Sequence, residues 1–317
     1  MTASSPPAVP RRTRVYRNHH LDSTLWEGFV PRKDDIIIST PGKTGTTWTQ
    51  RIVGLLVFQS PTWPDTLNRV SPWLDSSFIV KVQDPRPLIE AQTHRRFLKS
   101  HLPLDGLPYF PEVKYISLGR DGRDVFMSLW NHYRSYTAEA YDLFDSGLPP
   151  EEHCPRCPDD IHEFWRIWIS QGAFPWESDG QPFGSHFQHV RSFWEHRRLP
   201  NLLLVHYNDL KRDLPGEMRR IAEYLEIEVP AAKWPGLVEA ATFEAMKRDA
   251  ELLLPEIGLV FEGGAQTFLH KGTNDRWRDV LRPEELAQYR AVVERSLSPE
   301  LARWLERGRE GRDPRRI

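Results

Sequence analysis

The chain has 317 residues, of which 39% are hydrophobic, and its 12 tryptophans and 15 phenylalanines are ample for a buried core. This length suits one large domain or two small ones. The formal net charge of −2 argues against a general nucleic-acid or membrane-surface binder, so any anion site must be a local concentration of basic groups.

The N-terminal stretch, residues 1–18, is rich in proline, serine and arginine and contains no apolar signal core. We therefore expect a flexible tail over residues 1–18, a single domain over residues 19–317 and a cytoplasmic location. Near the first glycine-containing loop, the longest apolar run is Leu55 to Phe58. That run is far shorter than the roughly 18 to 20 residues that cross a bilayer, so we do not expect an integral membrane protein.

The first predicted element is a strand that leads through a short loop into a helix. Ile36, Ile37 and Ile38 predict a buried parallel strand, and the sequence from Thr46 onward places Trp48, Ile52, Leu55 and Leu56 on one helical face. The loop between them is Pro41-Gly42-Lys43-Thr44-Gly45. Backbone N–H groups at a helix N-terminus can surround an anion, and the lysine adds a positive charge. The composition therefore predicts a phosphate or sulfate site.

This loop has one obvious alternative interpretation, the Walker A loop of nucleotide-binding ATPases. Gly42-Lys43-Thr44 matches the end of that motif, but the glycine required five residues earlier is replaced by Ile37, inside the strand. The remaining pattern, Pro-x-Lys-Thr-Gly-Thr-Thr-Trp, resembles the 5′-phosphosulfate loop of the cytosolic-type sulfotransferases. The donor of that family is 3′-phosphoadenosine 5′-phosphosulfate (PAPS).

Further strands and helices alternate along the chain. The predicted strands after the first cover residues 96–101, 113–118 and 201–207. One predicted helix begins near Asp124 or Val125, and the others cover residues 161–170, 186–198, 214–225, 235–247 and 284–305. This order predicts an α/β fold with a central parallel sheet flanked by helices and a P-loop-like strand–loop–helix. The long segment 136–184 is more typical of a lid or an acceptor wall than of a second domain.

Lys99 and His101 lie two residues apart at the expected end of a strand, so their side chains can project to the same side. A near-neutral imidazole can remove the proton of a hydroxyl acceptor, and a lysine can accommodate negative charge on the leaving phosphate. Taken alone, His101 is more typical of an ordinary loop histidine. Its segment, Lys-Ser-His-Leu-Pro, resembles the family's Lys-x-His-x-Pro, in which the histidine is the catalytic base.

The segment from Arg120 to Ser128 resembles the family's 3′-phosphate motif, an arginine followed eight residues later by a serine. An arginine can contact phosphate through two charge-assisted hydrogen bonds, and a hydroxyl on the following helix can close the other side. An exposed helix start with ordinary capping is the alternative. By the same resemblance, Tyr207 and Phe243 correspond to the aromatic residues beside adenine, although either could simply belong to the core.

A third segment, residues 268–278, only partly resembles the family's C-terminal Arg-Lys-Gly-x-x-Gly-Asp-Trp-Lys. Lys271 and Gly272 match and are expected to serve the phosphate. His270 replaces the usual arginine and is a weaker, pH-sensitive candidate. Asp275 and Arg276 replace Gly-Asp, with an effect that the sequence leaves open. The family's usual dimer motif, Lys-x-x-x-Thr-Val, is absent, so the oligomeric state stays open as well.

Only two cysteines are present, Cys154 and Cys157, with His153 and His162 nearby. One such pair without a second is weak evidence for zinc, and a disulfide is unexpected in a reducing cytosol. We expect a surface loop here and no metal.

The resemblance implies a PAPS-dependent sulfotransferase that forms a sulfate ester on a hydroxyl acceptor, a phenol, an alcohol or a glycolipid, and releases 3′-phosphoadenosine 5′-phosphate (PAP). Catalysis is expected from Lys43, Lys99 and His101. Lys43 is expected to contact the 5′-phosphosulfate, and Thr44, Gly45, Thr46 and Thr47 are expected to bind the 5′-phosphate. Trp48 is expected to belong to the same cofactor site.

Two other functions compete with this interpretation, a small-molecule kinase and an inactive nucleotide-binding protein. A kinase would need a carboxylate to hold Mg²⁺ near the loop, and no strand ends in a suitable aspartate; retention of Lys99 and His101 argues against an inactive protein. The sequence does not identify the acceptor. Trp73, His132, Tyr133 and the aromatic residues of segment 136–184 are candidates for its walls, and each could equally be core.

Overall fold

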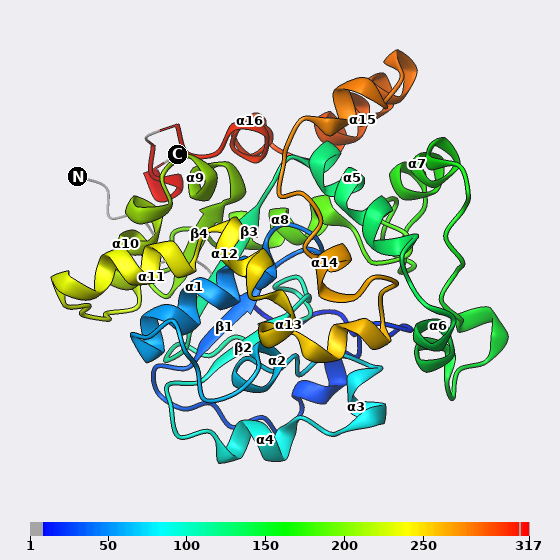
Figure 1. Ribbon diagram of the computed structural model, residues 1–317. Helices are drawn as coiled ribbons and strands as arrows, with labels where there is room; N and C mark the ends of the chain where they lie inside the picture. Colours follow the sequence, from blue (N-terminus) through cyan, green and yellow to red (C-terminus); the bar gives the residue numbers. More distant parts are fainter. Residues whose placement is uncertain (1–8, 311, 317) are drawn as a thin grey trace.

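The computed structural model describes residues 9–310 and 312–316. A four-stranded parallel sheet in the order β2-β1-β3-β4 lies at its centre (Figure 1). Its strands are β1 (Ile36–Ser39), β2 (Phe97–Ser100), β3 (Lys114–Gly119) and β4 (Leu202–His206). Ile38 pairs with both Lys99 and Ile116, so the neighbouring strands β2, β1 and β3 are in register and end at one edge. The predicted fold class is confirmed.

Alternation along the strands produces two apolar cores, one on each face of the sheet. Ile36 and Ile38 belong to the core that also contains Ile52 of α1, whereas Ile37 belongs to the core that contains Phe126 of α5. The first core is covered by α1 (Thr46–Phe58), α10 (Leu214–Tyr224) and α11 (Trp234–Ala240). The second is covered by α5 (Gly122–Tyr133), α7 (Ile161–Ser170), α8 (His186–Trp194), α15 (Pro283–Ser296) and α16 (Pro299–Arg307).

Shorter helices complete the described part of the chain. They are α2 (Leu67–Val70), α3 (Ile79–Val82), α4 (Arg86–Ala91), α6 (Ala138–Asp145), α9 (Tyr207–Arg212), α12 (Phe243–Arg248), α13 (Ala250–Leu253) and α14 (Gly264–Phe268). Short 3-10 turns lie at Ser23–Trp26, Pro150–Glu152, Ala231–Lys233, Pro255–Leu259, Arg276–Asp279 and Pro314–Arg316. Among the described helices, none has both the length and the apolar character that a membrane crossing requires.

Two predicted helices are each divided in the structure. The segment 235–247 breaks between α11 and α12, where the Thr242 hydroxyl accepts a hydrogen bond from the Ala245 amide at 3.1 Å and starts a new helix. The segment 284–305 breaks between α15 and α16, where Ser298 caps Leu301 in the same way, at 3.3 Å. Both breaks follow from N-cap residues that satisfy the free amides of a first turn. Apolar periodicity alone does not reveal them.

The segment 136–184 contains α6 and α7 and contributes aromatic side chains to the interior. The N-terminal segment that is described packs against the domain: Tyr16 is 1% exposed, and its hydroxyl donates to the Asp105 carboxylate at 2.9 Å. Residues 1–8 of the predicted tail lie outside the described residues.

Candidate active site

A cavity of about 320 Å³ lies beyond the carboxyl ends of the strands. The segments that directly follow β1, β2, β3 and β4 contribute Lys43, His101, Arg120 and Tyr207 to its lining, and Tyr207 is the first residue of α9. Every predicted site residue lines this cavity except Thr44. Parallel strands place their carboxyl ends at one edge of the sheet, which explains why segments far apart in the sequence meet here.

The loop after β1 makes a tight turn into α1. Lys43 and Gly45 both have positive φ, +64° and +114°. A Cβ on Gly45 would meet the Tyr207 ring at 3.1 Å, so a glycine is required here for its conformation and for the close approach. The Thr44 hydroxyl donates to the Pro41 carbonyl at 2.9 Å, and that of Thr46 contacts the Thr40 hydroxyl at 2.5 Å. These two threonines fix the loop with their side chains, which leaves the first amides of α1 for an anion.

The Lys43 ammonium group is held between a ring face and an imidazole. Its Nζ lies 4.6 Å from the centre of the Phe268 ring and 3.2 Å from Nδ1 of His132. Burial, together with the charges of Arg120 and Lys99, lowers the pKa of Lys43 to about 7. A bound anion would oppose all three causes, so this lysine is suited to donate to a negatively charged oxygen.

His101 presents one ring nitrogen as an acceptor. Its Nδ1 lies 2.7 Å from the Thr40 carbonyl oxygen, which can only accept, so Nδ1 bears the proton and Nε2 has a lone pair. Burial and the charges of Lys99 and Lys43 lower the pKa of His101 to about 3, so the ring is neutral. The Lys99 ammonium lies over the Trp73 ring at 4.0 Å, and burial lowers the pKa of Lys99 to about 8.

Sequence reasoning missed the buried Asp75, which supports this group. It accepts hydrogen bonds from the Trp73 indole at 2.5 Å, the Trp26 indole at 2.8 Å and the His101 amide at 3.4 Å. Asp75 thus ties the wall residue Trp73 to the backbone of His101. A lone aspartate in a loop-rich passage gave no signal of this role.

Arg120 lies two residues before α5, and Ser128 of that helix lines the same cavity. Its guanidinium lies over the Tyr207 ring at 4.0 Å and donates to the Lys43 carbonyl at 3.0 Å and to Asn274 Oδ1 at 3.1 Å. Its buried Nε has no hydrogen-bond partner among the described residues. The arginine is therefore held in place by its neighbours, and its guanidinium keeps N–H groups that these contacts do not use.

The aromatic residues form one packed group. The Trp48 ring meets the Tyr207 ring edge-on at 5.4 Å, and the Tyr207 hydroxyl donates to the Gly272 carbonyl at 3.3 Å. Gly272 has φ +63°, and a Cβ there would meet the Phe243 ring at 2.8 Å. Of the other wall candidates, Trp73 and His132 line the cavity, whereas Tyr133 is not part of its lining.

The divergent segment 270–276 brings a cation that was not assigned a role from sequence. Arg276 lines the cavity, and its Nε has no partner among the described residues. Burial, and to a smaller extent the charge of Arg120, lowers the pKa of Arg276. The Asp275 amide donates to Asp124 at 2.7 Å, which anchors the turn. His270 also lines the cavity, and burial and nearby cations, Arg276 first, lower its pKa. A second arginine therefore lies near Arg120, displaced from the position where the motif predicts it.

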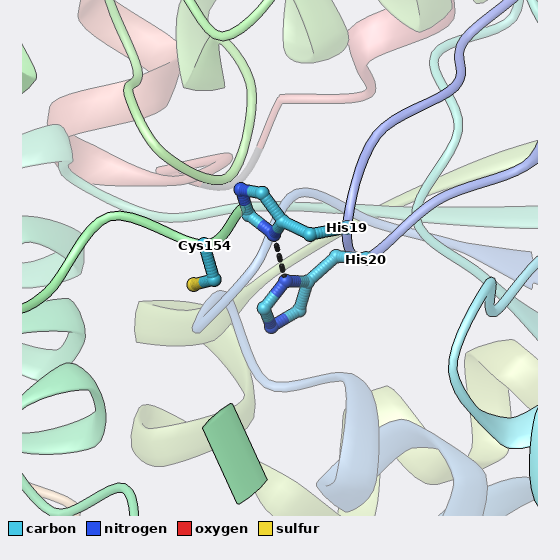
Figure 2. A group of neighbouring side chains, drawn as sticks. All are labelled: His19, His20 and Cys154. Carbon is cyan, nitrogen blue, oxygen red and sulfur yellow. Dashed lines mark hydrogen bonds between the residues drawn. The ribbon is translucent and has the colours of Figure 1, made fainter. Parts of the chain in front are cut away.

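Among the described residues, Cys154 and Cys157 do not form a group of possible metal ligands with His153 and His162. His162 contacts Glu285 at 2.8 Å, and His153 contacts the Leu148 carbonyl at 3.0 Å. Instead, donor atoms of His19, His20 and Cys154 lie within 4.8 Å of one another (Figure 2). By atom type these three could hold a metal ion. The two imidazoles are already joined through their Nδ1 atoms at 2.5 Å, which makes them partners in a hydrogen bond.

This chain is similar to several known proteins over most of its length. The sulfotransferase domain model matches residues 33–303. A glycolipid sulfotransferase of Mycobacterium bovis is 32% identical over 322 residues, covering 95% of this chain and 96% of that protein. A rabbit (Oryctolagus cuniculus) amine sulfotransferase is 28% identical over 285 residues, covering 86% of this chain and 83% of that protein.

Two solved structures share the fold. Retinol dehydratase, in complex with androsterone and the inactive cofactor PAP, aligns with a TM-score of 0.66 and 24% identity over 87% of this chain and 84% of the other. A mouse sulfotransferase complexed with PAP aligns with a TM-score of 0.64 and 20% identity over 89% of this chain and 91% of the other.

Proposed function

Since the chain belongs to the sulfotransferase family and is a PAPS-dependent sulfotransferase, we propose that it sulfates the hydroxyl of a large, largely apolar acceptor such as a glycolipid, with His101 as the base. The observation that most supports this proposal is that the three proposed catalytic residues line the same cavity. His101, which has a lone pair on Nε2, lines one cavity together with Lys43 and Lys99, and aromatic residues form much of the rest of its wall.

The cavity suits a ligand with several phosphate or sulfate groups. Arg120 and Arg276 each have a buried Nε without a partner among the described residues, and both line the cavity with Lys43. Buried guanidinium donors without partners are costly, so an anion that satisfies them binds favourably. Arg120, Ser128, Arg276, His270, Lys271 and Gly272 would hold the 3′-phosphate side, and Lys43 with the first turn of α1 would hold the phosphosulfate.

PAPS supplies the sulfuryl group, whose bond to the 5′-phosphate oxygen breaks as the acceptor oxygen forms its own bond to sulfur, leaving PAP. Nε2 of His101 accepts the proton that the hydroxyl loses. The Lys43 ammonium donates to the oxygen on which negative charge develops, and Lys99 balances the charge of the transferring group. Such fixed donors in a buried site stabilise a transition state more than mobile water does.

The acceptor side is apolar. Trp73, next to His101, and Phe78, Phe144, Phe183 and Phe261 line the cavity beyond the two lysines. Aromatic walls of this kind favour a lipid chain or ring system over a small hydrophilic alcohol. The mycobacterial relatives named as glycolipid sulfotransferases support the same acceptor class.

The test is transfer of labelled sulfate from PAPS by the pure protein to a panel of phenols, short alcohols, sterols and glycolipids. We expect sulfated glycolipid or a similarly large alcohol to form fastest, with one PAP released for each ester. Equal rates for short hydrophilic alcohols would contradict the proposed acceptor class. PAP binding without transfer to any acceptor would instead support an inactive nucleotide-binding protein.

Other expectations from the sequence remain predictions. These are the cytoplasmic location, the absence of a required metal and the absence of a nucleic-acid partner. Activity that survives dialysis against a chelator would support the second.

A further inference from the structure

A network of hydrogen bonds runs from Lys43 along the wall of the cavity to the N-terminal segment. Lys43 Nζ lies 3.2 Å from His132 Nδ1, and His132 Nε2 lies 3.0 Å from the Tyr136 hydroxyl. The same hydroxyl lies 3.1 Å from His20 Nε2, and His20 Nδ1 lies 2.5 Å from His19 Nδ1. Figure 2 shows the last of these contacts beside Cys154. This network connects the loop after β1, the end of α5 and the N-terminal segment.

The ammonium group of Lys43 determines which group donates in every hydrogen bond of this network. An ammonium group can only donate, so His132 Nδ1 must accept and His132 must carry its proton on Nε2. That N–H donates to the Tyr136 oxygen, the Tyr136 hydroxyl donates to His20 Nε2, and His20 Nδ1–H donates to His19 Nδ1. Each of the three middle groups donates once and accepts once. With Lys43 protonated, these four contacts are satisfied by one arrangement of protons.

Burial makes the loss of any one of these hydrogen bonds costly. His19, His20 and Tyr136 are at most 7% exposed, so water cannot replace a missing partner easily. Burial lowers the pKa of His20 and of His132 well below the usual value, so both rings are neutral and able to accept. Reversing the tautomer of His132 would direct an N–H at the Lys43 ammonium, and Tyr136 opposes that reversal through the bond it accepts.

Lys43 would otherwise have considerable freedom. Its flexible side chain is confined by the Phe268 ring face on one side and His132 on the other. The His132 ring in turn packs on Phe261 with ring centres 4.6 Å apart. Catalysis by a fixed donor requires such confinement, because a displacement of about 1 Å can lower a rate by about a hundredfold.

We propose that His132 is a positioning residue that accepts a hydrogen bond from Lys43, and that Tyr136, supported by His20, fixes the tautomer in which it can do so. The inference rests on the proposed function for its catalytic consequence, since Lys43 matters to rate only if it donates during sulfuryl transfer. The hydrogen-bonded hold on Lys43 itself is independent of that function.

The test compares substitutions that differ in a single hydrogen-bonding ability. His132→Phe keeps a ring but removes both nitrogens. His132→Asn restores an acceptor near the position of Nδ1. Tyr136→Phe removes only the hydroxyl that fixes the tautomer. Tyr109→Phe is the matched control, because it removes a hydroxyl bonded to Asn201 at 2.7 Å, and Tyr109 is not part of the cavity lining.

The first measurement follows the protonation of Lys43 without any turnover. Lysines are labelled with an amine-reactive reagent across pH, and the Lys43 peptide is quantified by mass spectrometry. A neutral acceptor favours the charged form of the lysine, so losing it should lower the labelling pKa of Lys43 by about one unit in His132→Phe. Tyr136→Phe should shift it in the same direction, and His132→Asn and Tyr109→Phe should leave it near the wild-type value. The other groups whose charges act on Lys43, Arg120 and Lys99, are unchanged in all four variants.

The second measurement is kinetic. We expect kcat to fall about 10- to 100-fold in His132→Phe with little change in KM for PAPS, and the alkaline fall of kcat to begin at lower pH. His132→Asn should recover most of the rate.

If His132→Phe does not fold, Tyr136→Phe provides both measurements. An unchanged Lys43 labelling pKa in the folded variants would overturn the inference. The variants could shift the labelling pKa of Lys43 as expected while the wild-type protein transfers no sulfate. That result would refute the proposed function but would still support the hydrogen bond from Lys43 to His132.

Discussion

Replacing Arg120 by alanine should weaken binding of PAP far more than binding of adenosine 5′-phosphate, which lacks the 3′-phosphate. Arg120 stacks on Tyr207 and donates to the Lys43 carbonyl, to the Thr273 carbonyl and to Asn274, so its position is set before any ligand arrives. These contacts use three of the five N–H donors of the guanidinium, and its Nε has no partner among the described residues.

The substitution has two effects of different size. Losing the bonds to Lys43, Thr273 and Asn274 loosens two loops and should weaken both ligands by a similar amount. Losing the charge-assisted contact to the 3′-phosphate affects PAP alone and should cost about 1.5 to 3 kcal/mol. The ratio of the two dissociation constants should therefore change by about 10- to 150-fold. Arg120→Lys should recover only part of this, because an ammonium cannot reproduce the planar fork of donors.

Isothermal titration calorimetry of both ligands on wild type and variants forms a double-mutant cycle. Arg303→Ala, at an exposed position on α16, is the control for removing a positive charge. Equal losses for the two ligands in Arg120→Ala would assign this arginine to loop structure and remove it from the 3′-phosphate site.

Three further predictions concern the same cavity. PAP should raise the melting temperature, by an amount equivalent to about 2.7 kcal/mol of stability at a hundred times its dissociation constant, and ATP with Mg²⁺ should do less; the reverse order in thermal denaturation would favour a kinase. Arg276→Gln should weaken PAP binding about tenfold, as expected for one charge-assisted contact, whereas His270→Gln should change it by less than about threefold at pH 8, where the ring is neutral; the opposite order would place the lost arginine's role on His270. Because burial lowers the pKa of Lys43 to about 7 and that of Lys99 to about 8, and a bound anion raises both, PAP binding should take up protons at pH 8 and affinity should fall as pH rises through this range. Calorimetry in buffers of different ionisation enthalpy measures that uptake, and the absence of uptake at pH 8 would show that the two lysines are already charged without ligand.

The strands and the cavity edge were predictable because their signals are local. A run of isoleucines, followed by a glycine-containing loop, specifies β1 and the start of α1 within thirteen residues or so. Local signals also mark Lys99 near the end of β2, His101 directly after it, and Arg120 directly after β3. Parallel packing then brings the ends of these strands together without further information.

What could not be predicted depends on contacts between distant segments. His20 and Tyr136 lie 116 residues apart in the sequence, and neither belongs to a motif. Arg276 enters the cavity because its turn is anchored by Asp124, from α5. The helix breaks at Thr242 and Ser298 did have a local signal, a capping hydroxyl, but continuous amphipathic patterning on both sides outweighed it.

The central claim is that one cavity binds the nucleotide and deprotonates the acceptor with different residues. The most direct measurement is single-turnover transfer of labelled sulfate from PAPS to the best acceptor by wild type and by His101→Ala, with PAP affinity and melting temperature measured on the same samples. We predict that transfer falls about 10²- to 10⁴-fold, as expected for the loss of a general base, while PAP affinity and stability change little. Transfer at the wild-type rate in this variant would show that the proton goes elsewhere and would contradict the account.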